Sequence, residues 1–206
     1  MTEQEIHNIC KEYNITNYSI NPDGSIDVDG IVKLLYMGFE KLPLKFNRVS
    51  GDFICNRNRL ITLEGSPKYV GGFFDCGNNQ LENLEGSPKE VGQDFYCQYN
   101  KLTSLKGCSE FIGGGFYCQT NNLSTLEGIP LKLGSTLNCL SNNITTLKGF
   151  PIYVKGNLFL IYNPISIVDS SISVIDGRID IGNTEFSDII KNLDDDKMKI
   201  LFEHGL

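Results

Sequence analysis

A period of 21 residues runs through most of this chain without an insertion. An apolar residue opens each copy, at Val32, Phe53, Phe74, Phe95, Phe116, Leu137, Leu158 and Ile179. A second follows two residues later, at Leu34, Cys55, Cys76, Cys97, Cys118, Cys139, Leu160 and Ile181. Periods of this length are typical of stacked solenoids. Because one copy cannot bury its own apolar face, we expect the copies to share one continuous core.

Each copy predicts a short strand and then a turn. Phe95 and Cys97 alternate with Tyr96 and Gln98, and a period of two indicates a strand with one face inward. Gly and Pro later in the copy favour an extended or single-turn return over an α-helix. An Asn whose amide we expect to hold the turn recurs at Asn58, Asn79, Asn100, Asn121, Asn142 and Asn163.

The spacing Phe-x-Cys-x-x-Asn-x-Leu-x-x-Leu resembles the leucine-rich repeat signature, with Cys in place of an inner Leu. The short period is similar to that of a bacterial subclass found in secreted effectors. Phage-encoded leucine-rich repeat proteins carry a similar Phe-x-Cys-x-x-Asn sequence and an opening similar to Asp23–Gly30. The resemblance covers residues 28–182 and implies a β-rich arc with a parallel sheet on its concave face and few or no helices opposite. Met37 and Thr184 replace the repeated Asn in the first and last copies.

The chain divides into a repeat region and two ends. We expect an N-terminal cap over residues 1–30, eight repeats over 31–182 with the last incomplete, and a helical cap over 183–206. Caps are expected because the ends of a solenoid otherwise expose core.

Local signals support both caps. Thr2 with Glu5 predicts a capping box on a first helix, and Asn21–Gly24 predicts the turn of a β-hairpin. At the other end, Phe186–Leu193 predicts a short helix, and Asp194 is a suitable N-cap for a last one. The run of three Asp that begins there suits a helix start, and a metal or phosphate-mimic site is the alternative.

The seven cysteines are interpreted as free thiols. Five share one inward repeat position, where in-register neighbours about 4.8 Å apart point the same way and suit disulfide geometry poorly. We call these five residues the cysteine ladder. Reduced thiols are typical of the cytosol, so we expect a cytoplasmic protein, in the host cell if it is encoded by a phage. A metal site is the alternative, but His7 and His204, the two histidines, lie outside the repeats.

Charge and hydropathy exclude two kinds of partner. The net charge of −7 argues against a nucleic-acid binder, which needs a stripe of Lys and Arg, but it permits a basic partner surface. No apolar run approaches the about 20 residues that span a membrane. The N-terminus carries no apolar segment of the signal-peptide type.

No set of residues indicates catalysis, and we expect neither an enzyme nor a cofactor or metal. Gly113–Gly115 lacks the Lys-Ser/Thr ending of a phosphate loop. Cys108 lies off the cysteine ladder, and a reactive thiol there would need a basic neighbour, for which the repeat supplies only Lys106. The effectors that this chain resembles can carry a separate ubiquitin-ligase domain, and we expect none among the residues that follow the eighth repeat here, because they are too few.

The outward side chains of the strands are the candidate binding surface. They vary between copies while the inward ones hardly change, as expected of a surface fitted to a partner. Parallel sheets are normally covered on both faces, so a bare face rich in Tyr and Phe is typical of a binding site; the alternative is that aromatic residues simply suit strands. The predicted partner-binding residues are Tyr36, Ile54, Arg57, Asp75, Tyr96, Gln98, Tyr99, Tyr117, Gln119, Phe159 and Tyr162.

These observations predict a non-enzymatic protein–protein interaction module. The phage resemblance implies a bacteriophage protein that binds, and in one version inhibits, a host or defence protein. Two alternatives stay open: a structural or self-assembling virion component, and a protein that sequesters a small ligand in an aromatic arc. The chain is expected to be a monomer or a homodimer.

Overall fold

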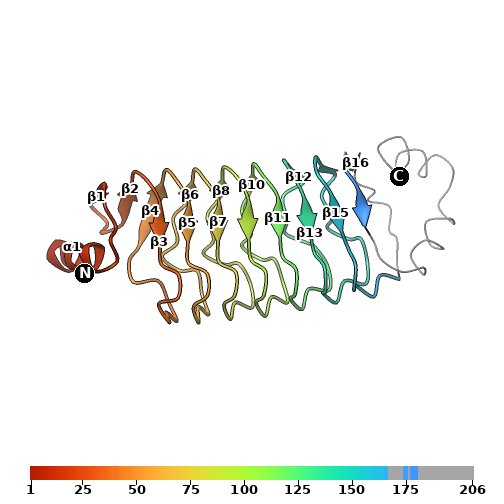
Figure 1. Cartoon of the computed structure of the whole chain (residues 1–206), viewed down its shortest axis with the longest axis horizontal. Helices are drawn as coiled ribbons and strands as arrows, with labels where there is room; N and C mark the ends of the chain where they lie inside the picture. Colours follow the sequence, from red (N-terminus) through yellow and green to blue (C-terminus); the bar gives the residue numbers. More distant parts are fainter. Residues whose placement is uncertain (167–173, 176, 181–206) are drawn as a thin grey trace.

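The computed structural model describes residues 1–166, 174–175 and 177–180. It is a β-solenoid with parallel sheets, and its one described helix lies at the N-terminal end (Figure 1). The predicted fold class is therefore confirmed. The helical cap predicted for residues 183–206 lies outside the described residues.

One parallel sheet, here called the front sheet, runs the length of the solenoid and has eight strands. Neighbouring strands pair in strict register, so that Phe95 lies between Phe74 and Phe116. This register follows from the constant repeat length, because every strand meets its copy one turn later. The strands are β3 (Val32–Lys33), β5 (Phe53–Ile54), β7 (Phe74–Asp75), β9 (Phe95–Tyr96), β11 (Phe116–Tyr117), β13 (Leu137–Asn138), β15 (Leu158–Phe159) and β17 (Ile179–Asp180).

The return segments are extended, as predicted, and they pair into two further sheets that the sequence pattern did not indicate. Six strands form the first, with β1 antiparallel to β2 and the others parallel: β1 (Tyr18–Ile20), β2 (Ile26–Val28), β4 (Phe46–Val49), β6 (Tyr69–Val70), β8 (Glu90–Val91) and β10 (Phe111–Ile112). Three form the second: β12 (Lys132–Leu133), β14 (Tyr153–Val154) and β16 (Val174–Ile175). We call the two together the back sheets.

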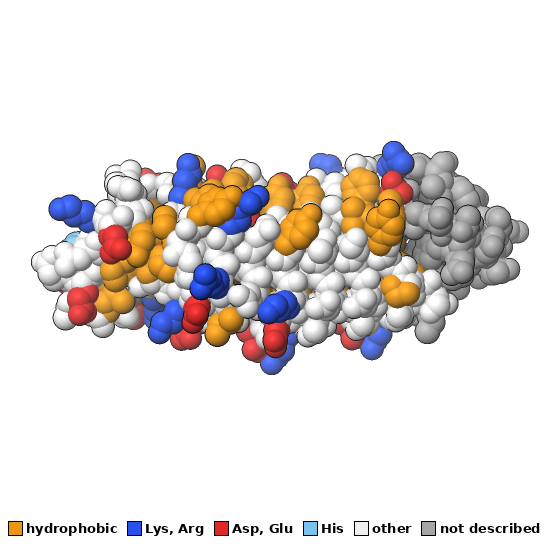
Figure 2. All heavy atoms as spheres, turned by 60° about the horizontal axis from the view of Figure 1, so that its bottom comes forward, with side chains coloured by type: hydrophobic (Ala, Val, Ile, Leu, Met, Phe, Trp, Pro, Cys, Tyr) orange, Lys and Arg blue, Asp and Glu red, His pale blue; other side chains and the backbone are white. Residues whose placement is uncertain are grey.

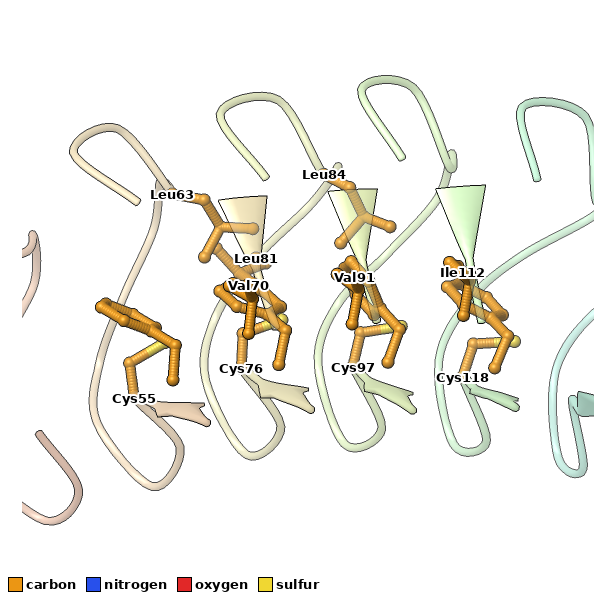
Figure 3. Close-up of a cluster of buried hydrophobic side chains, with 14 of the residues drawn as sticks. Cys55, Leu63, Val70, Cys76, Leu81, Leu84, Val91, Cys97, Ile112 and Cys118 are labelled. Carbon is orange, nitrogen blue, oxygen red and sulfur yellow. The ribbon is translucent and has the colours of Figure 1, made fainter. Parts of the chain in front are cut away.

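The core lies between the front and back sheets and is built of repeated rows. The Phe rings of successive strands touch, with centroids 5.8 Å apart for Phe53 and Phe74 and 5.1 Å for Phe74 and Phe95. The five ladder cysteines are fully buried and unbridged, which confirms their inward position. Figure 3 labels four of them, Cys55, Cys76, Cys97 and Cys118. Burial raises the pKa of each ladder thiol, as at Cys97, because a thiolate is poorly solvated there.

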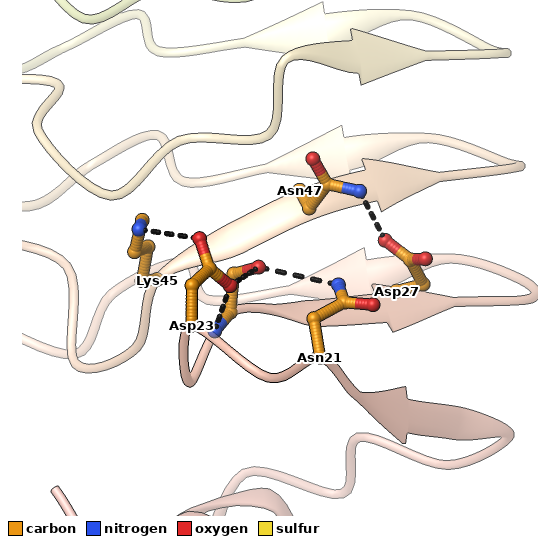
Figure 4. Close-up of polar contacts among 6 residues, drawn as sticks. Asn21, Asp23, Asp27, Lys45 and Asn47 are labelled. Carbon is orange, nitrogen blue, oxygen red and sulfur yellow. Dashed lines mark hydrogen bonds and ion pairs between the residues drawn. The ribbon is translucent and has the colours of Figure 1, made fainter.

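The N-terminal cap closes one end of this core. Helix α1 (Glu3–Glu12) begins with the predicted capping box, and it buries Ile6 and Cys10. The hairpin of β1 and β2 extends the first back sheet. Its turn is tied to the first repeat by Lys45 Nζ, which lies 2.8 Å from Asp23 Oδ2 (Figure 4). Hydrogen bonding to Lys45 lowers the pKa of Asp23.

Candidate protein-binding surface

The outward side chains of the front sheet form what we call the outer face, over which no described helix or strand lies. They stand in rows, because residues at one repeat position meet in every turn. One row holds Asp52, Phe73, Asp94, Gly115 and Thr136; the next holds Ile54, Asp75, Tyr96, Tyr117, Asn138 and Phe159; and the third holds Asn56, Gly77, Gln98, Gln119, Leu140 and Ile161.

An aromatic cluster occupies the middle of the outer face. The rings of Tyr96 and Tyr117 stack with centroids 4.7 Å apart, and Phe73 meets Tyr96 edge to face at 5.9 Å. The Tyr96 hydroxyl donates to Asp94 Oδ2 at 2.8 Å. Partial burial raises the pKa of Tyr96 and of Tyr117. The cluster is thus a surface of uncharged aromatic rings that hold one another in place and are partly shielded from water.

A polar group adjoins this cluster at Asp75. Its carboxylate accepts hydrogen bonds from the Gly77 N–H, at 2.9 Å, and from Asn56 Nδ2. The Gln98 amide crosses over Gly77, since a Cβ there would lie only 2.8 Å from Gln98 Nε2 and 3.1 Å from Asp75 Oδ1. Burial raises the pKa of Asp75. We call Asn56, Asp75, Gly77 and Gln98 the Asp75 cluster.

Several amide oxygens of the outer face are buried without a hydrogen-bond partner. They are Asn56 Oδ1, Gln98 Oε1 and Gln119 Oε1, and within the described residues the one other such side-chain atom is Ser66 Oγ. Buried polar atoms are nearly always bonded in folded proteins. The three orphaned acceptors share one repeat position, so the unsatisfied amide oxygens of the outer face lie in one row.

A fourth row follows the strands and has left-handed backbone geometry at each of its described positions. The φ angles lie between 52° and 60° at Tyr36, Arg57, Asn78, Tyr99, Thr120, Ser141 and Tyr162. Such geometry costs a residue other than Gly about 1 kcal/mol or more, yet Gly occupies none of these positions. Tyr36, Tyr99 and Tyr162 are 65%, 53% and 79% exposed. The Arg57 guanidinium lies 5.2 Å from the Tyr36 ring.

The eleven predicted residues fall into two groups on this surface. Ile54, Asp75, Tyr96, Tyr117, Phe159, Gln98 and Gln119 are half-buried on the outer face, whereas Tyr36, Arg57, Tyr99 and Tyr162 are exposed in the left-handed row. The structure brings Tyr96 against Tyr117 and Arg57 against Tyr36. Sequence reasoning missed Phe73 and Asp94, one alternation earlier. Extending the period of two backwards by one step would have found them.

Other features of the described residues bear on the class of protein. No group of three or more His, Cys, Asp or Glu side chains is placed to hold a metal ion within the described ranges. No helix in that part of the chain is long and apolar enough to cross a membrane. No protein-family model matches the chain, and no curated protein or solved structure shows significant similarity to it.

Proposed function

We propose that this chain is a non-enzymatic protein-interaction module that binds its partner through the outer face of the front sheet. One observation carries the proposal: the outer face varies from turn to turn and holds an aromatic cluster, while the core beneath it repeats almost unchanged. Stability needs only the repeated core. Variation restricted to the opposite side of the same strands is what selection for one partner would produce.

The order of the aromatic cluster supports binding in a second way. Tyr96 and Tyr117 hold each other by stacking, and Asp94 holds the Tyr96 hydroxyl. Rings that are already fixed lose little conformational freedom when a partner arrives, so more of the contact energy appears as affinity. Tyr is also among the residue types that dominate binding energy at protein interfaces.

The identity of the partner is proposed from resemblance alone. The repeat sequence and the opening Asp23–Gly30 resemble phage-encoded leucine-rich repeat proteins, which suggests a product that acts in the cytoplasm of an infected bacterium. In that setting the partner would be a host or defence protein, and binding would block it.

Self-association is a second candidate, favoured by a separate observation. Phe111, Leu131 and Ile152 on the back-sheet side are 55%, 65% and 49% exposed, and Ile152 N donates to Leu131 O across adjacent turns. Hydrophobic side chains also reach the surface in patches along the long axis (Figure 2). Contiguous exposed apolar residues mark association surfaces. Analytical ultracentrifugation of the wild type and of Phe111→Ser/Leu131→Ser tests this candidate, and a monomer at every concentration would rule it out.

The principal test is a pull-down from bacterial lysate with the wild type and the variant Tyr96→Ala/Tyr99→Ala/Tyr117→Ala. A matched control, Tyr69→Ala/Tyr153→Ala, removes tyrosines from the back sheets. We expect one or a few proteins that the wild type and the control retain and that the triple variant loses. If every captured protein is retained equally by all three, the outer face is not the binding surface.

A further inference from the structure

The Asp75 cluster differs chemically from the rest of the outer face. It contains a carboxylate between two amides, and both of those amides bury an oxygen that accepts no hydrogen bond, Asn56 Oδ1 and Gln98 Oε1. The two amide oxygens lack donors, and the carboxylate beside them adds a negative charge. The neighbouring rings of Phe73 and Tyr96 add two aromatic surfaces, which attract cations.

The charges of the outer face also favour a cationic partner. From the turn of β5 to the turn of β13 its three rows contain Asp52, Asp75 and Asp94 and no Lys or Arg. Each carboxylate accepts at least one backbone or side-chain hydrogen bond, from Phe73 N, Gly77 N and Gly115 N among others. Their negative charge is therefore fixed in place rather than carried on freely moving side chains.

We infer that the Asp75 cluster binds an arginine side chain presented by a protein partner. This inference rests on the proposed function and specifies the chemistry of the partner. A guanidinium carries five N–H donors in a planar fork, which suits a site with one carboxylate, two orphaned amide oxygens and adjacent rings. A lysine ammonium has three donors and no flat face. The chain already contains a guanidinium on a tyrosine ring, with Arg48 only 3.9 Å from the Tyr69 centroid.

Two side chains determine how the arginine would enter. The Gln98 amide lies across Gly77, so it turns outward on binding and presents Oε1 to the guanidinium; this motion is open to it because its oxygen forms no hydrogen bond in the free protein. Arg57 is close enough for its charge to act on Asp75, although its guanidinium lies over Tyr36 instead. Arg57 therefore opposes a second cation, and its removal should strengthen binding.

The test uses the full chain and a defined probe, the peptide acetyl-Ser-Arg-Ser-Arg-Ser-amide, with the same peptide carrying Lys in place of Arg. Binding is measured by calorimetry and by NMR of the side-chain amides of Asn56 and Gln98. We expect the Arg peptide to shift both amides and to bind about fivefold or more tightly than the Lys peptide. Asp75→Asn should weaken the Arg peptide about tenfold, a change of 1.4 kcal/mol, whereas Arg57→Gln should tighten it.

Glu90→Gln is the matched control, because it removes the same charge from exposed Glu90 in β8 of the back sheets. It should change the affinity less than about twofold, as expected for a screened surface charge. If Asp75→Asn and Glu90→Gln weaken the peptide equally, or if Lys and Arg peptides bind alike, the attraction is non-specific and the inference is wrong. A shift of the same amides by calcium chloride alone would replace it with a metal site.

The two proposals fail separately. A lysate partner that depends on Tyr96, Tyr99 and Tyr117 but tolerates Asp75→Asn would overturn the arginine site and leave the interaction module standing. Loss of that partner with Asp75→Asn but not with Glu90→Gln would support both.

Discussion

Asn79 joins its own turn to the turn before it, because its Oδ1 accepts a hydrogen bond from the backbone N–H of Leu60 at 2.9 Å. Its Nδ2 donates to Cys55 O of that earlier turn at 3.1 Å and to Cys76 O of its own turn at 3.0 Å. One buried amide thus replaces backbone pairing where the strand ends. The same pattern recurs at Asn100, Asn121, Asn142 and Asn163.

Removing one of these amides should destabilise the solenoid strongly. Asn100→Ala leaves Leu81 N without its acceptor, and it removes one of the two amide donors at each of the carbonyls of Cys76 and Cys97. An unsatisfied buried group costs about 1–3 kcal/mol, and each further hydrogen bond lost costs about 1 kcal/mol. We expect a loss of about 3 kcal/mol in urea unfolding. Asn100→Asp should be as harmful, because a carboxylate cannot donate to the carbonyls. Exposed Asn122→Ala is the control and should change stability little; similar losses at both sites would disprove the role of the amide.

A glycine in the return segment allows adjacent turns to approach closely. A Cβ at Gly92 would collide with the carbonyl oxygen of Gly71 in the preceding turn. Since that neighbour is backbone, it cannot move aside, and we expect Gly92→Ala to lower the midpoint of thermal unfolding sharply or to prevent folding. Gly38→Ala separates collision from backbone strain, because Gly38 has a φ of 74° and open space around its Cβ. It should cost only about 1 kcal/mol, and an equal effect of both substitutions would exclude the collision.

The left-handed row should contain stabilising substitutions. Thr120 is β-branched and has a φ of 57°, a conformation that Asn tolerates better. Thr120→Asn is expected to raise the free energy of unfolding by about 0.5–1 kcal/mol, measured by chemical denaturation. Thr145→Asn, at an exposed position outside the left-handed row, should give no gain. If Thr120→Asn also gives no gain in stability, the turn itself relieves the strain.

The cysteine ladder predicts loss of stability in alkali. Burial raises the pKa of the ladder thiols in the folded protein, including Cys76, Cys97 and Cys118. Above about pH 8.5 the unfolded chain ionises while the folded one does not. The unfolded state then binds fewer protons, so stability falls as pH rises, by about 1.4 kcal/mol per pH unit for each thiol. Urea unfolding from pH 7 to pH 10 measures the slope. Cys97→Val should reduce the slope of unfolding free energy against pH by the contribution of one thiol. An unchanged slope would contradict the explanation.

Asp75 should show a conflict between stability and the proposed binding. Burial raises the pKa of Asp75, so the ionised form is disfavoured in the folded state. The protonated carboxyl therefore contributes its full stability at low pH, and this contribution is lost as pH rises through the folded pKa. In Asp75→Asn the new Nδ2 can donate to the orphaned Asn56 Oδ1 after the Asn56 amide turns over. We expect this variant to be more stable than the wild type at pH 7 and to differ from it less at pH 3. Equal stability at both values would mean that Asp75 is well solvated.

The sequence predicts the core residues well because they are dictated by a repeated local pattern. Phe95, Cys97 and Asn100 have the same neighbours as their counterparts in the next copy, so one interpretation serves every turn. The sequence does not predict that the return segments pair into sheets. In most turns each of those strands is only two residues long, and it lies in a stretch that contains Gly and Pro. Their pairing depends on the stacking distance, which exists only after the turns assemble.

The outer face was predictable as a set of positions but not as a site. Period-two alternation determines by itself that Asp75, Tyr96 and Gln98 point away from the core, and the constant repeat length determines that each row lies in register along the solenoid. Only the tertiary structure decides that the Gln98 amide crosses Gly77 toward Asp75, that Tyr96 stacks on Tyr117, and that three amide oxygens remain without donors. These contacts join residues about 20 positions apart. They depend on side-chain rotamers and on burial, and no local sequence pattern encodes the rotamers or the burial.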